Sequence, residues 1–180
     1  KYVLVIMDQF TKWVELVPTV DQRAITVVDA FFQRIMCRHG CPVRLLSDNG
    51  PQFRSALVET LCQEFGIQKI FSSAYYPQGD GYAERFMRTL NNSLSTLAAQ
   101  EQATWDKFVI GLQFAYNSSE HEATSVSPFE LNTGRVPRMP GEETATLVVA
   151  SSDPAKYSRK LRQVVQASQQ RAQECVQKFW

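Results

Sequence analysis

Long apolar runs are missing from this 180-residue chain, and none reaches the ~18 residues that a membrane-spanning helix needs. The first ten residues, "KYVLVIMDQF", reach an Asp after one short apolar run, with no small-residue cleavage site following, which excludes a secretory signal peptide. We therefore expect no membrane partner. The abrupt start on an apolar strand is typical of a piece cut from a longer chain.

Cysteine and histidine are scarce, with four and two residues respectively. The segment "CRHGC" brings Cys37, His39 and Cys41 together, but no second pair of ligands follows at a spacing that a zinc site would use. We therefore interpret the cysteines as reduced, mostly buried thiols, which are typical of an intracellular protein.

Net charge is also small, at +1, and by itself does not indicate a nucleic-acid-binding protein. The basic residues are concentrated at the C-terminal end, where six Lys or Arg residues accompany two acids from Asp153 onward. Pro154 can begin a helix there whose apolar positions extend to Phe179. This helix is either a packing helix with a solvated basic side or a connector to a further domain, and we favour the connector.

Strand patterns and helix patterns alternate along the chain, which predicts an α/β fold with a central mixed sheet. Strands are predicted at residues 2–7, 13–18, 43–47 and 67–73. Helices are predicted at residues 21–38, 54–65, 82–97 and 104–117. The strand at 2–7 is expected to be buried on both faces, and Asp21 is expected to cap the first helix. Leu57, Leu61 and Phe65 are expected to share one apolar side of the second helix. Residues 124–137 are turn-rich and short on periodicity.

Two acids draw attention because of where they lie. Asp48 follows a short strand in "LLSDNGPQF", and Glu84 lies in the first turn of a helix that follows the Gly-rich stretch "YYPQGDGYAE". Each has an ordinary explanation, since Asp favours turns and Glu favours helix starts. By their spacing alone, with 35 residues between them, we would favour those explanations.

The surrounding motifs change that interpretation. "SDNGPQF", "SSAYYPQGDGYAERFMRTL" and "FAYNSSEHEATSVSPFELNTGRVP" closely resemble the integrase catalytic core of retroviruses and of Ty3/gypsy-type retrotransposons. "VLVIMDQFTKWVELVP" and "FFQRIMCRHGCP" are similar to the preceding segments of that core. The resemblance covers residues 1–137 and implies an RNase H-like fold, with a mixed β-sheet flanked by helices and a C-terminal extension helix. Residues 138–153 would then be a linker, and residues 154–180 a basic amphipathic connector helix.

The resemblance implies an active site of the D,D-35-E type, in which Asp48 is the second Asp and Glu84 the Glu. Both would be catalytic residues and ligands of Mg²⁺ or Mn²⁺. The family's first Asp lies on a preceding strand, which we expect before Lys1, so the fragment itself is expected to be inactive. Asp8 matches the turn after the family's second strand, and we interpret it as a turn residue.

The helix that begins near Glu84 supplies the candidate DNA contacts. Arg88 lies one turn beyond Glu84 on the same side of the predicted helix. There it either binds a DNA phosphate or forms an ion pair with Glu84. Further candidates for DNA binding are Arg85, Gln78 and Asn91. Two positions depart from the family pattern, since Tyr76 replaces its usual His and Met87 its usual Asn.

Phosphodiester transfer needs charge stabilised on both the attacking and the leaving oxygen, which two divalent metals held by carboxylates provide. The leading hypothesis is therefore a retroelement integrase core that joins a DNA 3′-hydroxyl to a target phosphodiester. Its partners would be DNA and further copies of itself, and its location the nucleus. The alternatives are a domesticated or decayed integrase that binds DNA or protein without catalysis, and a nuclease of the same fold.

Overall fold

The computed structural model describes residues 1–72 and 104–139, together with positions 88, 90, 92, 95, 163, 165–167, 170 and 174. The chain divides into two compact units. The first comprises Lys1–Ile6 and Glu15–Leu112, and the second Met7–Val14 and Gln113–Trp180. The separately described positions are helical, and they fall within the two segments predicted to be helices at 82–97 and 154–179.

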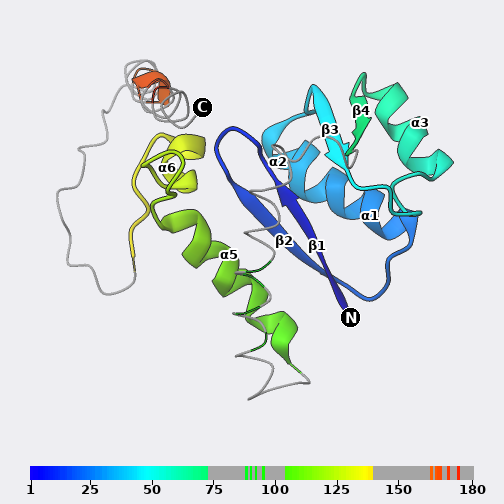
Figure 1. The fold of residues 1–180 in the computed structure, drawn as a ribbon, viewed down its shortest axis with the longest axis horizontal. Coiled ribbons are helices and arrows are strands. Elements are labelled where there is room, and N and C mark those ends of the chain that lie inside the picture. The colour runs from blue at the N-terminus through cyan, green and yellow to red at the C-terminus, as the bar shows by residue number, and fades with distance from the viewer. Residues whose placement is uncertain are drawn as a thin grey trace. The chain divides into compact units, whose positions relative to one another are not determined.

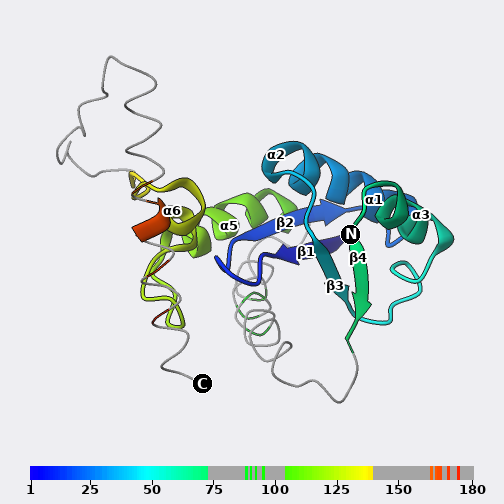
Figure 2. The ribbon, with the colours of Figure 1, turned by 90° about the horizontal axis from the view of Figure 1, so that it is seen from above.

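Four strands form two separate pairs in the described part of the chain (Figure 1). Their bounds are β1, Tyr2–Met7; β2, Val14–Thr19; β3, Arg44–Ser47; and β4, Gln68–Phe71. β1 pairs with β2, and β3 pairs with β4 in parallel, as Figure 2 shows from above. The connection between β1 and β2 is too short for the crossover that parallel strands require, so this pair is an antiparallel hairpin. The α/β class is confirmed, but the described strands form two sheets and not one.

Burial of the first two strands differs from the prediction. β1 was expected to be buried on both faces, yet five of its six residues are only partly buried and Tyr2 is exposed. β2 is the buried strand, with Val14, Glu15 and Leu16 each at most 3% exposed. An uninterrupted apolar run is therefore no proof of two covered faces, because burial depends on what packs against the strand.

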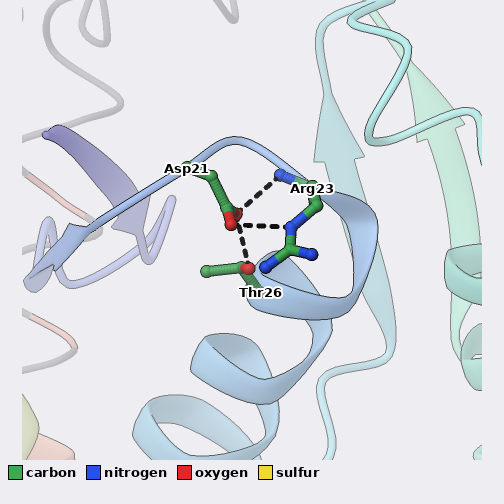
Figure 3. Close-up of polar contacts among 3 residues, drawn as sticks. All are labelled: Asp21, Arg23 and Thr26. Atoms are coloured by element: carbon green, nitrogen blue, oxygen red, sulfur yellow. Dashed lines mark hydrogen bonds and ion pairs between the residues drawn. The ribbon is translucent and has the colours of Figure 1, made fainter.

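The first helix begins later than predicted and changes its geometry. It comprises α1 (Ala24–Phe31), a π-helical turn (Phe32–Met36) and α2 (Cys37–His39). Asp21 is not the N-cap, which is Arg23, and the side chain of Arg23 makes no capping bond. The Asp21 carboxylate instead accepts hydrogen bonds from the Arg23 backbone N–H at 3.0 Å, from Arg23 Nε at 2.6 Å and from Thr26 Oγ1 at 2.6 Å (Figure 3). Asp21 thus orders the helix start from two residues upstream of the cap.

The core of the first unit lies between helices and the β3–β4 pair. α3 (Ala56–Glu64) begins at Ser55, whose Oγ accepts the Val58 N–H at 3.3 Å, and it packs beside α1 and β4. The central cluster contains Phe31, Met36, Val58, Cys62 and Ile67, and Leu61 packs against it. The predicted apolar side of this helix is wrong in part, because Leu57 and Phe65 are 41% and 46% exposed.

The cysteines are less buried than predicted. Cys62 is buried, but Cys37 and Cys41 are exposed, and all three are free thiols. Both exposed cysteines lie beside the turn at Gly40, which has a φ of +88° and ends the helix at the surface. The prediction of mostly buried thiols is therefore wrong for the described cysteines.

The second unit includes the tip of the β1–β2 hairpin and the later part of a helix. α5 (Val109–Ser118) follows a 3₁₀ turn at Trp105–Lys107 and enters this unit at Gln113. The side-chain amide of Asn117, near its end, bonds both the N–H and the C=O of Val14 at 2.9 Å. Because Asn117 is buried, this paired contact satisfies the polar groups of both residues.

A helix that the periodicity did not reveal also belongs to the second unit. α6 (Pro128–Thr133) begins at Ser127, whose Oγ accepts the Glu130 N–H at 3.1 Å, and ends at Gly134 with a φ of +72°. Its Phe129 ring lies 6.1 Å from that of Trp13. Among the described residues, no helix combines the length and apolar character that crossing a membrane would require.

Candidate functional site

Asp48 lies where β3 ends, as the sequence analysis predicts for this residue. It is exposed, and its Oδ1 accepts the Gly50 N–H at 2.9 Å. Among the described residues, no donor reaches its Oδ2 within hydrogen-bonding distance. The Asp48 carboxylate therefore lies at the surface. The Gly50 N–H holds its Oδ1, and its Oδ2 has no hydrogen-bond donor among the described residues.

The loop that carries Asp48 is tied to the neighbouring strand on its N-terminal side. The Ser72 N–H donates to the Ser47 carbonyl at 2.8 Å, and Asn49 Nδ2 donates to the Ser72 carbonyl at 3.1 Å. These bonds continue the β3–β4 pairing past the end of both strands. Asp48 is consequently enclosed by two residues whose positions are fixed by β4.

The same loop closes on itself on its C-terminal side. The N–H groups of Phe53 and Arg54 both donate to the Gly50 carbonyl, at 2.9 and 3.2 Å. A Cβ on Gly50 would lie 3.0 Å from Asp48 Oδ1 and 2.7 Å from Gln52 Nε2. Gly50 thus permits the close approach that lets its N–H reach the Asp48 carboxylate.

Lys69 of β4 contacts this loop through its side chain. Its ammonium donates a hydrogen bond to Ser47 Oγ, and Ser47 Oγ in turn donates to the Asp48 carbonyl at 2.9 Å. Burial lowers the pKa of Lys69, while the charges of Cys62 and Asp48 act in the opposite direction. Burial also raises the pKa of the Cys62 thiol, against the effect of Lys69.

Asp8 occupies a comparable strand end but uses its carboxylate differently. Its Oδ2 accepts both the N–H and the Oγ1 of Thr11, each at 2.7 Å. Its own N–H donates to the Trp13 carbonyl at 2.8 Å, and Lys12 follows with a φ of +62°. The structure thus places Asp8 in a self-contained hairpin turn, in agreement with its interpretation as a turn residue.

Most of the other predicted site residues lie outside the described part of the chain. These are Glu84, Arg85, Gln78 and Asn91, so the predicted meeting of Glu84 with Asp48 stays a prediction. Arg88 is described, at a helical and exposed position. No cluster of three or more Asp, Glu, His or Cys residues with metal-binding geometry occurs among the described residues.

Lys69 is the residue of this region that the sequence analysis did not single out. Its contact with the Asp48 loop depends on the parallel register that sets Lys69 opposite Leu45. The only signal in the sequence is a Lys next to Gln68 among the apolar residues of "IQKIF". A strand-embedded Lys of this kind would ordinarily be read as facing solvent.

Comparison with known proteins identifies the kind of domain. Residues 1–77 match the family model described as integrase core domain. "Uncharacterized protein K02A2.6" of Caenorhabditis elegans is 36% identical over 138 residues, covering 74% of this chain and 10% of that protein. The "Pol polyprotein" of feline endogenous virus ECE1 is 31% identical over 137 residues, covering 76% and 13% respectively. The chain therefore corresponds to about a tenth of the length of these relatives.

A solved structure supports the fold. The HTLV-2 integrase catalytic core domain in complex with magnesium, in its trimeric form, aligns with a TM-score of 0.60. The alignment covers 72% of this chain and 83% of that one, at 18% sequence identity. The RNase H-like α/β fold predicted from the sequence is confirmed by this likeness.

Proposed function

Because this chain carries an integrase core domain related to those of retroviruses and retrotransposons, we propose that it belongs to an enzyme that joins a DNA 3′-hydroxyl to a target phosphodiester. The observation that carries the proposal is the exposed Asp48 carboxylate at the end of β3, of which only Oδ1 receives a hydrogen bond from the described residues.

The donor chemistry of the proposed site fits Mg²⁺ or Mn²⁺. Carboxylate oxygens are hard ligands, and Mg²⁺ in proteins is held by one or two carboxylates with several waters retained. Asp48 would supply one carboxylate and Glu84 the second. When bound, such ions stabilise charge on the attacking and leaving oxygens of phosphodiester transfer.

The residues of the chain itself have distinct tasks in this proposal. Asp48 holds the metal with the oxygen that the Gly50 N–H does not occupy, and the Gly50 bond fixes the rotation of the carboxylate. Arg88, exposed on its helix, meets a DNA phosphate and positions the strand without reading its sequence. Arg85, Gln78 and Asn91 are proposed as further DNA contacts.

The partners and the location follow from the same proposal. DNA would be bound both as the element's end and as the target, and the enzyme would act as a homo-oligomer in the nucleus. The HTLV-2 core, whose name includes a trimeric form, supports self-association by analogy. The basic segment from Asp153 onward suits a partner that carries phosphates.

A second candidate is a domesticated or decayed integrase that binds DNA or protein without catalysis. Tyr76 and Met87 favour it, because both replace residues usual in the family motifs close to the predicted site. The two candidates differ in one property, which is metal-dependent joining of DNA.

The experiment compares this chain with the same chain extended by its natural upstream segment. A labelled DNA end and a supercoiled plasmid are incubated with each protein, with Mg²⁺ or with EDTA. We expect joining only by the extended protein and only with Mg²⁺, because the upstream strand would carry the third carboxylate. DNA binding without joining by the extended protein would instead support the non-catalytic candidate. Full activity of the short chain that Asp8→Asn abolishes would show that Asp8 is the first catalytic carboxylate.

A further inference from the structure

Lys69 makes contacts on both sides of the residue proposed to hold the metal. Its ammonium donates a hydrogen bond to Ser47 Oγ, immediately before Asp48. The same ammonium lies 5.9 Å from the centre of the Phe53 ring, on the far side of the loop. One half-buried cation therefore bonds to the first residue of the segment 47–53 that carries Asp48 and lies at the outer range of a cation–π contact with its last residue.

A second aromatic ring holds the ammonium in place from its own strand. The Phe71 ring centre lies 4.5 Å from Lys69 Nζ, well within the range of a cation–π contact. Lys69 is thus held by two rings and one hydroxyl, and its stem is fixed by the pairing of β4 with β3. A single surface contact stabilises too little to offset the side-chain entropy that a lysine loses when it is held in one position. Several contacts are therefore needed to hold Lys69.

The bond to Ser47 connects Lys69 to the backbone of Asp48. Ser47 Oγ accepts from Lys69 and donates to the Asp48 carbonyl at 2.9 Å, so its hydroxyl has one defined orientation. The Asp48 backbone is then held through Ser47, and its side chain is held by Gly50. This arrangement fixes the carboxylate without occupying its second oxygen.

We propose that Lys69 is a positioning residue, which holds the 47–53 loop at both ends and thereby aims the Asp48 carboxylate. This inference rests on the proposed function, since it concerns the efficiency of a site that uses Asp48. Outer-shell partners that orient a ligand commonly change activity by about 10–100-fold when they are removed. In this proposal Lys69 orients Asp48 and makes no contact with DNA.

The first measurement is made on the 180-residue chain and needs no activity. Lys69→Met keeps the length of the apolar stem but removes the charge, and Lys69→Arg keeps a cation and a donor. We expect amide hydrogen exchange at Gly50 and Ser72 to become about tenfold faster in Lys69→Met, because a charge-assisted hydrogen bond is lost. Lys69→Arg should restore most of the protection. Lys107→Met, at an exposed position of the 3₁₀ turn, is the control and should change neither amide.

The second measurement is the steady-state kinetics of DNA joining by the complete integrase that contains this chain. Lys69→Met should lower kcat about tenfold and leave the KM for DNA unchanged, since positioning affects the reacting geometry and not DNA capture. Ser47→Ala should have a similar effect, and the double variant should be no worse than the worse single one. Additive losses would show that Lys69 and Ser47 act independently, and a rise in KM alone would show that Lys69 acts on DNA capture. Either result would overturn the proposal.

Asp48→Asn separates failure of this inference from failure of the proposed function. If Asp48→Asn retains joining activity, the proposed function is wrong, whatever Lys69 does. If Asp48→Asn is inactive while Lys69→Met has the wild-type kcat, only the positioning role is wrong. If the complete protein shows no joining at all, the exchange measurement still decides whether Lys69 holds the loop, and unchanged protection in Lys69→Met would refute it.

Discussion

Asp8 and Asp48 both follow a strand and both begin a turn, yet their carboxylates do different things. Asp8 Oδ2 takes two hydrogen bonds from Thr11 within its own hairpin. Asp48 takes one, from the Gly50 backbone, and in both acids the other carboxylate oxygen receives no hydrogen bond from the described residues. The neighbouring cations also differ, because Lys12 donates to the Gln9 carbonyl whereas Lys69 reaches the loop of Asp48 from another strand.

This difference shows how a structural acid can be told from a candidate ligand. A carboxylate that takes two hydrogen bonds from its own turn contributes to local stability. A carboxylate whose loop is held by other groups can keep an oxygen available. Substitutions at the two positions should therefore have different effects. Changes at Asp48 should reduce activity, and changes at Asp8 should reduce stability.

The largest effect is expected on catalysis. Asp48→Asn in the complete integrase should reduce Mg²⁺-dependent joining by more than the roughly 100-fold upper range of outer-shell substitutions, because it removes a metal ligand. Asp8→Asn should retain activity, since the amide oxygen can still accept from Thr11. Joining of a labelled DNA end to plasmid measures both, and equal losses in the two variants would contradict the comparison.

The effect on stability should run the other way. Asp8→Ala leaves the Thr11 N–H and hydroxyl without their acceptor, and we expect a loss of about 1 kcal/mol in the free energy of unfolding. Asp48→Ala removes an exposed side chain with one bond and should stay within about 0.5 kcal/mol of the wild type. Urea unfolding of the 180-residue chain at pH 7 measures both values. A larger loss for Asp48→Ala would mean that its loop is built for stability.

Basic residues of the two units extend the comparison to DNA binding. Arg88 belongs to the unit of Asp48 and is exposed, whereas Arg135 belongs to the unit of Asp8, with its guanidinium 6.0 Å from the Phe129 ring centre. Arg88→Ala should weaken binding to all DNA sequences alike and reduce the salt slope by about one. Arg135→Ala should leave the slope unchanged. Fluorescence anisotropy over a series of salt concentrations tests this, and a loss confined to one DNA sequence would argue against a phosphate contact.

A smaller, pH-dependent effect is expected at Asp21. The hydrogen bond from Thr26, followed by that from the Arg23 backbone, holds the pKa of Asp21 below its ordinary value of 3.8. Because the folded pKa is lowered, the stabilisation is fully present above the unfolded value and is lost as pH falls through the folded one. The stability difference between wild type and Asp21→Asn should therefore shrink on acidification below pH 3.8. Thr26→Val removes the hydrogen bond that contributes most to the lowered pKa of Asp21, and it should narrow the pH range over which this stabilisation is lost. A stability difference between wild type and Asp21→Asn that does not change with pH would refute this prediction.

The sequence predicted the positions of the described strands to within one or two residues, because each contains apolar residues and lies between turn residues. It did not predict α6, since six residues are too few to show a helical period. The signal that was present is local, namely Ser127 at the N-cap, Pro128 next to it and Glu130 two residues further on. The first helix was predicted as continuous because a π-helical turn leaves no mark in the apolar pattern.

The candidate site was predictable only in part. The position of Asp48 at a strand end follows from "LLSDNG", and its likeness to a family motif suggested the role. The contacts of Lys69 with Ser47 and Phe53 were not predictable, because they depend on strand register and on the path of the loop. Glu84 lies outside the described residues, so its part in the site still rests on the resemblance.

The central claim is that Asp48, and not Asp8, is a metal ligand, and paramagnetic broadening by Mn²⁺ tests it most directly. In amide NMR spectra of the 180-residue chain, trace Mn²⁺ should broaden the signals of Asn49 and Gly50 and leave those of Thr11 and Lys12 sharp. Asp48→Asn should abolish the broadening, and Asp8→Asn should not change it. Broadening centred on Thr11 and Lys12, or broadening of Gly50 that persists in Asp48→Asn, would contradict the account.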